Sequence, residues 1–292
     1  MMSRARADSL SGALLVLPAI GFLLVFFLAP NLLLVGYSVI ARMEAGVMQY
    51  GLTFDNYVRA FSVDLYWLVL VRTVRMGLMA ALVSAAIAYP LAIAIAQGGL
   101  FGRVVTLVVV TPLLVNVVIR SYAWSQLLSR QGALNWALTN LGIAENPPQL
   151  LYTEWAVLIA SVHVFLPFIV LPLAAAIGAI APEIGQAARM AGANRVRVFL
   201  RVILPLSVPG LAVGLSLVFS LTAAAYVTPQ ILGGNFSPLI GTLIHQQVLA
   251  LNDWPFGAAL ASLLIVLVLS INLVFLRGAE RLTRRWTAGA GN

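Results

Sequence analysis

The chain has 292 residues, of which 62% are hydrophobic and only 9% are charged, and its 17 basic and 9 acidic residues give a formal net charge of +8 at pH 7. A charged fraction this far below the roughly 25% of soluble domains excludes an ordinary soluble domain and indicates a membrane protein. The absence of cysteine excludes a disulfide framework and a thiolate metal site. We interpret the basic excess as a consequence of membrane topology rather than as a nucleic-acid surface.

Long uncharged runs predict six membrane-spanning helices, because a bilayer core of about 30 Å needs about 20 apolar helical residues to cross it. The fold class expected is therefore an all-α integral membrane protein. The predicted spans, in chain order, are 12–38, 73–97, 104–127, 155–178, 206–228 and 255–277.

Three connections are predicted to lie outside the membrane, at 41–72, 128–154 and 229–254. Within the last connection, Pro238 to Leu251 is apolar enough to be helical but too short to cross a bilayer. A short surface or re-entrant helix is expected there. In the first span, Pro18 and Pro30 are expected to kink the helix rather than end it.

The arginines orient these spans. With the N-terminus inside, the whole net charge of +8 falls on the cytoplasmic segments, as the positive-inside bias predicts. Both termini and the segment 181–205 are therefore expected in the cytoplasm. The inside arginines are Arg4, Arg6, Arg103, Arg189, Arg195, Arg197, Arg201, Arg277, Arg281, Arg284 and Arg285, against Asp8, Glu183 and Glu280; the remaining six arginines (42, 59, 72, 75, 120, 130) are matched by six acids (44, 55, 64, 145, 154, 253).

The segment 181–205 separates two long apolar spans and carries its own helix signals. Pro182 suits the first helical position, and Glu183 follows in the first turn, where the helix dipole favours an acid. Gly192 can adopt a positive φ and stop this helix, and a second helical stretch is expected over 195–203. The pattern predicts a helix–glycine–helix segment just below the membrane.

The sequence Gln186-Ala-Ala-Arg-Met-Ala-Gly-Ala-Asn, followed by Leu204-Pro205 and Pro209-Gly210, resembles the cytoplasmic "EAA" loop of permease subunits of bacterial binding-protein-dependent ABC importers. The resemblance implies a type I ABC importer permease fold in which this loop receives mechanical force from an ATPase. The alternative interpretation is an ordinary amphipathic connector with basic snorkelling residues. The ATPase-coupling residues that the resemblance implies are Glu183, Gln186, Ala187, Ala188, Gly192, Ala193, Phe199, Leu204 and Pro205.

One position departs from the family pattern. Gln186 stands where the family has a glutamate, which puts in doubt any ion pair that the glutamate makes. Glu183 lies one turn earlier on the predicted helix and can replace part of that charge.

Three further motifs extend the resemblance over nearly the whole chain and towards the spermidine/putrescine branch of these permeases. They are Arg120-Ser-Tyr-Ala-Trp124, Leu166-Pro-Phe with Leu171-Pro172, and Tyr226-Val-Thr-Pro-Gln-Ile-Leu-Gly-Gly234. The resemblance implies that the chain forms one half of an import pathway. The pathway works by alternating access, and its expected solute is a small polyamine or related amine. The alternatives are another small solute (an amino-acid derivative, opine, metal chelate or anion) and, from another class, a secondary transporter.

The resemblance also implies partners and a domain organisation. The expected partners are a second, different permease subunit, two ATPase subunits that bind the ATP, an external solute-binding protein and the bacterial inner membrane, with no nucleic acid and no cofactor in this chain. The expected domains are an N-terminal helix and external loop (1–65), a core of five helices containing the coupling loop (66–280) and a basic cytoplasmic tail (281–292).

Few polar residues fall where a translocation pathway is expected. The candidates are Arg120, Tyr122, Trp124, Tyr226 and Thr228. Arg120 either serves the pathway, since a charge within the membrane indicates function, or snorkels to the interface or pairs with an acid such as Glu154. The two aromatic residues of the third span either line a cavity or anchor at the interface, and Tyr226 and Thr228 either line a cavity or cap a helix.

Catalytic and metal sites are not expected. His245 has no acid or second histidine at ligand spacing, and His163 is expected to make a hydrogen bond between helices. No span carries facing carboxylates for a proton relay. The chain also lacks a glycine-rich Lys-Ser/Thr phosphate loop, so the ATPase must be a different protein.

Overall fold

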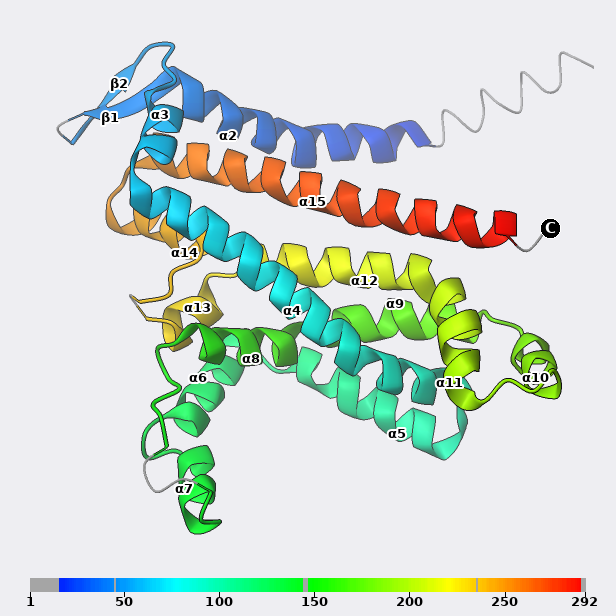
Figure 1. The fold of residues 1–292 in the computed structure, drawn as a ribbon. Coiled ribbons are helices and arrows are strands. Elements are labelled where there is room, and N and C mark those ends of the chain that lie inside the picture. The colour runs from blue at the N-terminus through cyan, green and yellow to red at the C-terminus, as the bar shows by residue number, and fades with distance from the viewer. Residues whose placement is uncertain (1–15, 45, 144–146, 235, 290–292) are drawn as a thin grey trace, which may run out of the picture. The chain divides into compact units, whose positions relative to one another are not determined.

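The computed structural model describes residues 16–44, 46–143, 147–234 and 236–289 (Figure 1). The predicted start of the first span at residue 12 lies outside the described residues, as do Arg4, Arg6, Asp8 and Glu145. The chain divides into two compact units, residues 1–63 with 244–263 and residues 64–243 with 264–292.

The first unit begins with the helix Val16–Ile40. Its turns at Leu24–Leu28 are π-helical (η1), and α2 (Ala29–Ile40) follows with Pro30 at its start. Because proline has no N–H to donate, the chain relieves the missing bond by widening the preceding turn. As expected, Pro18 and Pro30 do not end the helix, which continues through both to Ile40 with a π-helical segment before Pro30.

A short hairpin follows, which the all-α expectation did not include. Strands β1 (Ala41–Glu44) and β2 (Val47–Tyr50) pair antiparallel, and α3 (Asp55–Ser62) comes next. The buried amide of Asn56 donates to the carbonyls of Ser38 and Ala41, at 2.9 and 2.8 Å. One side chain of α3 therefore satisfies the carbonyls left free where α2 ends.

The short helix expected between Pro238 and Leu251 is confirmed as α14 (Ile240–His245), whose last two residues begin the second segment of this unit, and η4 (Gln246–Ala250). Helix α15 (Trp254–Gly289) begins directly afterwards. Arg59 of α3 pairs with the buried carboxylate of Asp253 at 2.7 Å, and its guanidinium lies 4.0 Å from the ring centre of Phe256. This pair fixes α3 against the start of α15.

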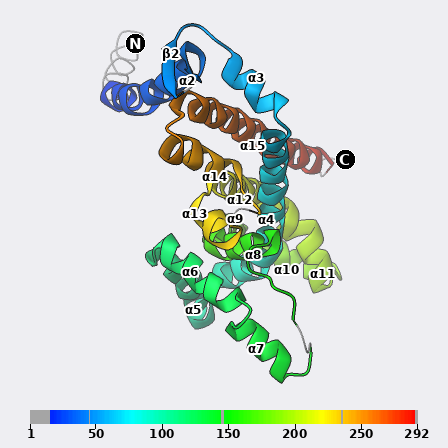
Figure 2. The same cartoon turned by 90° about the vertical axis from the view of Figure 1, so that its left-hand side faces the viewer.

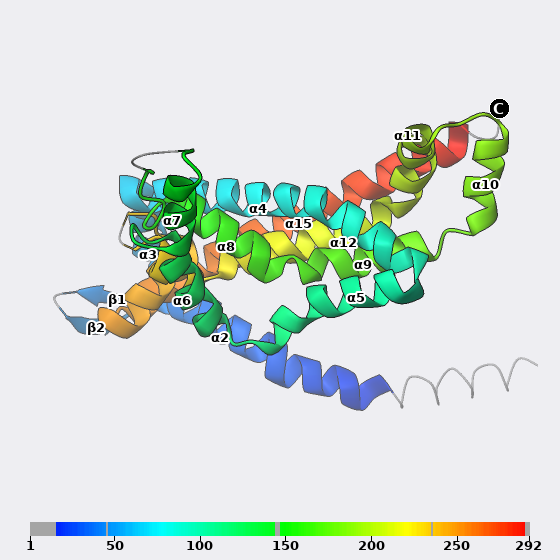
Figure 3. The same ribbon diagram turned by 90° about the horizontal axis from the view of Figure 1, so that it is seen from below.

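The core of the second unit is a packed group of three helices, α4 (Asp64–Gln97), α9 (Pro167–Gly178) and α12 (Leu204–Ala224), which lie side by side in Figures 1 and 3. Small residues permit the close approach. A Cβ at Gly210 or Gly214 would collide with α9, and one at Gly77 would meet the ring of Phe219 at 2.8 Å. This is how helices associate in lipid, where packing rather than the hydrophobic effect drives contact.

The third predicted span, 104–127, is not one straight helix. It consists of α5 (Gly99–Val110), the 3₁₀ turn η2 (Thr111–Leu114) and α6 (Val117–Leu128), with a bend of 102° at the break. Two local signals explain the correction: Pro112 removes a backbone donor, and the Asn116 side chain accepts from the Val118 N–H at 2.8 Å as an N-cap.

The fourth span is bent by 45° where α8 (Glu154–Phe165) meets α9 at Pro167. The second span starts earlier than predicted, because α4 includes residues 64–72 of the expected loop. The fifth span ends at Ala224 rather than at 228, and α13 (Val227–Leu232) follows as a separate short helix. The sixth, α15, continues past 277 to Gly289, through the predicted boundary between core and tail.

In the described residues, four helices are long and apolar enough to cross a membrane, and each of the two bent pairs can supply one more span. Six spans are therefore accommodated. Figure 3 shows α10 (Pro182–Met190) and α11 (Arg195–Val198) at one end of the second unit and α6, α8 and α7 (Ala133–Asn140) towards the other. Figure 2, viewed from that other end, shows α6 and α7 extending away from the packed helices.

Candidate functional site

The predicted coupling segment forms a short helix closed by a glycine motif. Helix α10 has Pro182 at its first position, as expected, and Gly192 has a φ of +85°. The Gly192 N–H donates to the Arg189 carbonyl at 2.9 Å, and the Ala193 N–H donates to the Ala188 carbonyl at 3.0 Å. These two bonds make a Schellman motif, which satisfies carbonyls at the helix end. Ala188, Gly192 and Ala193 therefore occupy the positions that a single Schellman motif requires at a helix end.

Asn194 starts the next helix at once, a role that the sequence reasoning did not assign. Its side-chain oxygen accepts from the Arg197 N–H at 2.8 Å, so α11 is capped one residue after the Schellman motif closes. An asparagine directly before a helical run was the available signal. The predicted second stretch 195–203 is helical, but it continues without a break into α12 through the π-helical segment η3 (Phe199–Ile203).

The predicted coupling residues divide by burial. Glu183, Gln186, Ala187 and Gly192 are exposed. The others, Ala188, Ala193, Phe199, Leu204 and Pro205, are partly buried, and the ring of Phe199 meets that of Tyr89 on α4 edge-on, with centroids 5.3 Å apart. The exposed group is available to another protein, whereas Phe199 of the partly buried group contacts a membrane helix of the chain itself.

A cavity of about 390 Å³ lies between α10 and the ends of α4 and α9. Its lining is mostly apolar, including Ile93, Ile177 and Val202, with Gln97 and Arg189 as polar members. Gly185 also lines it, and a Cβ there would meet nothing within 4 Å. Helix α10 is thus held away from the membrane helices by its two ends rather than packed against them.

The coupling segment carries four arginines, Arg189, Arg195, Arg197 and Arg201, all exposed. Among the residues that the structure describes, none of the four makes an ion pair. Their charge remains available to the membrane surface or to a partner.

Two predicted pathway residues, Arg120 and Trp124, lie where α6 meets α8. The Trp124 indole N–H donates to Nδ1 of His163 at 3.1 Å, which confirms the expected hydrogen bond of His163 between helices. Arg120 donates to the Val164 carbonyl at 3.4 Å, next to the turn that Pro167 interrupts. Its Nε atom is buried and has no hydrogen-bond partner.

The pairing of Arg120 with Glu154, one of the alternatives, is wrong. Glu154 instead binds Arg72 at 3.0 Å and Arg75, both on α4, because α4 begins early enough to bring these residues beside the first turn of α8. In the described part of the chain Arg120 has no ion pair.

The other pathway candidates are dispersed. Thr228 is buried and its hydroxyl lies 3.1 Å from that of Ser121, a contact that joins α13 to α6. Tyr122 is 58% exposed on α6, and Tyr226 is 44% exposed at the start of α13, where its side chain does not cap the helix. Ser121 was not among the predicted pathway residues, and nothing in the sequence around it indicates the contact with Thr228. The roles of all five candidates stay predictions.

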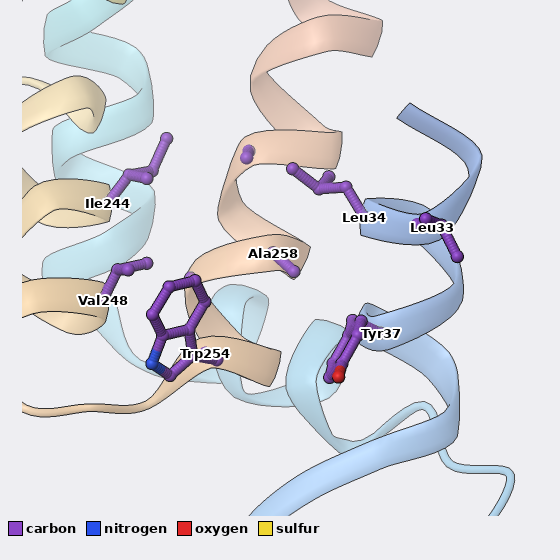
Figure 4. Close-up of a pocket in the computed structure, with 9 residues that line it drawn as sticks. Leu33, Leu34, Tyr37, Ile244, Val248, Trp254 and Ala258 are labelled. Carbon is purple, nitrogen blue, oxygen red and sulfur yellow. The ribbon is translucent and has the colours of Figure 1, made fainter. Parts of the chain in front are cut away.

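An apolar pocket of about 330 Å³ lies within the first unit (Figure 4). Leu33, Leu34 and Tyr37 of α2 face Trp254 and Ala258 of α15 across it, with Ile244 and Val248 on the opposite wall. No charged side chain lines it, and none of the predicted pathway residues does. Among the described residues there is also no cluster of three metal-ligating side chains.

Comparison with known proteins gives consistent matches. Residues 74–288 match the family model described as "Binding-protein-dependent transport system inner membrane component". The spermidine/putrescine transport system permease protein PotB of Escherichia coli (strain K12) is 33% identical over 272 residues, covering 93% of this chain and 98% of that protein. The protein of the same name from Haemophilus influenzae is 34% identical over 265 residues, covering 90% and 92%.

Among solved structures, a chain of a bacterial alginate ABC transporter, crystallised in complex with an alginate pentasaccharide-bound periplasmic protein, superimposes with a TM-score of 0.72. It is 22% identical, and the match covers 97% of this chain and 98% of that one. At this identity the likeness concerns the fold alone.

Proposed function

The chain belongs to the family of inner membrane components of binding-protein-dependent transport systems, and from this premise we propose that it is one half of the pathway of a polyamine importer. It is a multi-pass inner membrane permease with the type I ABC importer fold, and not an enzyme. The observation that carries the proposed substrate is the likeness to spermidine/putrescine permeases along 93% of the chain. The proposed solute is a small amine such as putrescine or spermidine.

The partners we propose are a second, different permease, two ATPase subunits and an external solute-binding protein. One observation supports a second permease: none of the most apolar stretch of the helix Val16–Ile40 is buried within this chain. A membrane helix whose most apolar stretch stays exposed in its own chain is suited to contact another subunit. ATP is bound by the ATPase subunits, and the segment 181–205 receives force from them.

We propose that both termini and the coupling segment lie in the cytoplasm. Supporting this, Ala279 of α15 packs with Val208 and Ala212 near the start of α12. The C-terminal part of α15, with its arginines, therefore lies at the same end of the second unit as α10 and α11. Fusions of a reporter after residue 285 should be active inside the cell; activity only on the external side would contradict the topology.

The substrate is tested by uptake into vesicles that contain the complete transporter and its binding protein. We expect ATP-dependent accumulation of labelled putrescine or spermidine, and competition between the two. A vesicle without ATP is the control for leakage. Uptake of an unrelated solute with no response to either polyamine would remove the assignment and leave the fold unaffected.

One observation favours a second substrate class. Arg120 lies beside the candidate pathway with a buried, unpartnered Nε and no ion pair in the described residues, and a guanidinium attracts anionic groups and repels amines. A small solute that carries a carboxylate beside its amine fits this feature better than a polyamine. Competition by 4-aminobutyrate that exceeds competition by putrescine would select this class.

A further inference from the structure

Tyr89 lies on α4 near the end that faces the coupling segment, half-buried and immediately before Pro90. A proline within a helix removes the hydrogen bond to the carbonyl four residues earlier, here that of Ala86. The helix is therefore weakened at the residue after Tyr89, and its last turns can change direction there.

The ring of Tyr89 contacts the coupling segment. It meets Phe199 edge-on, with centroids 5.3 Å apart and planes at 88°, the geometry that aromatic pairs prefer. Phe199 is the first residue of the π-helical segment η3, which joins α11 to α12. Short π-helical segments are rare and are concentrated at functional positions.

The hydroxyl of Tyr89 contacts α12. It lies 3.2 Å from the hydroxyl oxygen of Ser207, which is fully buried. The Ser207 hydroxyl donates its own hydrogen to the Leu204 carbonyl at 3.1 Å. Because a serine hydroxyl has a single hydrogen, Tyr89 is the donor to Ser207. One side chain of α4 thus contacts two successive segments, η3 through its ring and α12 through its hydroxyl.

The backbone at this junction is weakly held by its own hydrogen bonds. Pro205 has no N–H for the carbonyl of Arg201, and Pro209 has none for that of Pro205. The π-helical turn of η3 lies directly before these two prolines. The connection from the coupling segment to α12 therefore depends more on side-chain contacts than the backbone of an ordinary helix does.

We propose that Tyr89 is a positioning residue that links the coupling segment to α4, so that a displacement of α10 and α11 moves α4 together with α12. Helix α12 follows the coupling segment through the covalent chain. Helix α4, which also packs on α12, is joined to the coupling segment directly by the contacts of Tyr89. The proposal rests on the proposed function, because it supplies the route by which force from the ATPase reaches the helices of the pathway.

The first test compares solute uptake with ATP hydrolysis in vesicles that hold the complete transporter. Tyr89→Ala removes both contacts, and we expect uptake per ATP to fall about fivefold, the scale of losing one aromatic pair and one hydrogen bond. Tyr89→Phe keeps the ring contact and should stay within about twofold of wild type. Phe101→Ala is the matched control, since Phe101 is an aromatic residue of α5 that is 71% exposed.

The second test does not require the solute to be known. The chain has no cysteine, so introduced cysteines are unique within it. Spin labels at Met190 on α10 and Leu82 on α4 report the proposed link, and labels at Met190 and Val213 on α12 report the covalent one. All three side chains are exposed. Because linked segments move together, trapping the ATPases with nucleotide should leave the Met190–Leu82 distance nearly unchanged in wild type and in Tyr89→Phe.

In Tyr89→Ala we expect the Met190–Leu82 distance to change on trapping, because α10 then moves without α4, and the Met190–Val213 distance to behave as in wild type. A Met190–Leu82 distance that stays as constant in Tyr89→Ala as in wild type would overturn the proposal, as would an unchanged uptake per ATP. An equal loss in Phe101→Ala would also overturn it. Failure of the wild type to take up any polyamine refutes the proposed substrate and leaves the distance test decisive for Tyr89.

Discussion

Arginine serves two different purposes in two regions of this chain. In and beside the predicted external connections, Arg42, Arg59, Arg72 and Arg75 each pair with a carboxylate. In the coupling segment, four exposed arginines have no ion pair among the described residues. The first set joins helix and strand ends of the chain to one another, while the second leaves its charge for the membrane surface or a partner.

The difference indicates that the two regions are held by different interactions. Ion pairs join α4 to α8 and α3 to the start of α15. The coupling segment depends instead on backbone geometry: a Schellman motif at Gly192 and an N-cap at Asn194. Neutralising charges should therefore destabilise the first region, whereas changing backbone conformation should disable the second.

The largest effect is expected at Gly192. Its φ of +85° is inaccessible to proline, whose ring fixes φ near −65°, so Gly192→Pro must break the helix stop. We expect uptake to fall by more than about tenfold, since strain of this kind costs about 1–3 kcal/mol. Membrane insertion, measured by protease accessibility of external loops, should remain.

Gly185→Ala is the matched control for this change. It alters a glycine of the same helix that lacks a positive φ and whose Cβ would meet nothing within 4 Å. Uptake should stay near wild type, because alanine is the better helix former. Wild-type uptake and substrate-stimulated ATP hydrolysis in Gly192→Pro would show that backbone geometry is not what the coupling segment requires.

Glu154 gives the next largest effect. Glu154→Gln leaves Arg72 and Arg75 beside each other with no carboxylate between them. The three side chains are 26–55% exposed, so solvent screens the loss, and we expect destabilisation of about 1–2 kcal/mol, seen as a lower melting temperature of the purified permease. Arg195→Gln, which breaks no ion pair of the described residues, should leave the melting temperature unchanged. Equal shifts in both variants would remove the distinction between the two regions.

The helix–glycine–helix structure of residues 181–205 was predicted well from the sequence, because the signals for it are local. Pro182, Gly192 and the residues between them specify a helix start and a helix stop within a few residues, and backbone geometry obeys such signals directly. The positive-inside count also matched the external arginines with an equal number of acids, but only the fold decides which pairs form. Glu154 was considered as a partner for Arg120 and binds two arginines of α4 instead.

The region where α6 meets α8 and α13 was harder to predict because its structure depends on contacts between segments far apart in the chain. The run 104–127 is apolar throughout most of its length, so hydropathy indicates one straight span. Its 102° bend follows from Pro112 and from the N-cap of Asn116. These two residues contribute little to the hydropathy of the whole apolar run. The contacts of Ser121 with Thr228 and of Tyr89 with Phe199 and Ser207 cannot be read from spacing at all.

A smaller effect concerns the position that departs from the family pattern. Glu183 and Gln186 are one turn apart on α10 and both exposed, so Glu183 can supply the charge that the family places at Gln186. We expect Gln186→Glu to change uptake little and Glu183→Gln to weaken coupling by about 1 kcal/mol, the upper range for an exposed ion pair. ATP hydrolysis and uptake of both single variants decide between the two positions. Full activity of Glu183→Gln would rule out this compensation.

The smallest effect is a pH dependence in the hairpin region. A hydrogen bond from Arg42 holds the pKa of Asp55 below its ordinary value, with a second from the Thr53 hydroxyl, and the same contact raises the pKa of Arg42. A carboxyl whose pKa is lowered by folding stabilises the fold above its unfolded pKa of about 3.9. That contribution is lost as the pH falls through the lower folded value.

The melting temperature of wild type should therefore exceed that of Asp55→Asn by a constant margin from pH 7 to about pH 5, and the margin should shrink below about pH 4. The comparison of the two proteins at each pH cancels the titration of all other carboxyls. Because both side chains of the pair are exposed, the margin should be smaller than that of Glu154→Gln at every pH. A margin that already closes near pH 6 would mean that the pKa of Asp55 is raised, and that this external arginine does not act through the ion pair.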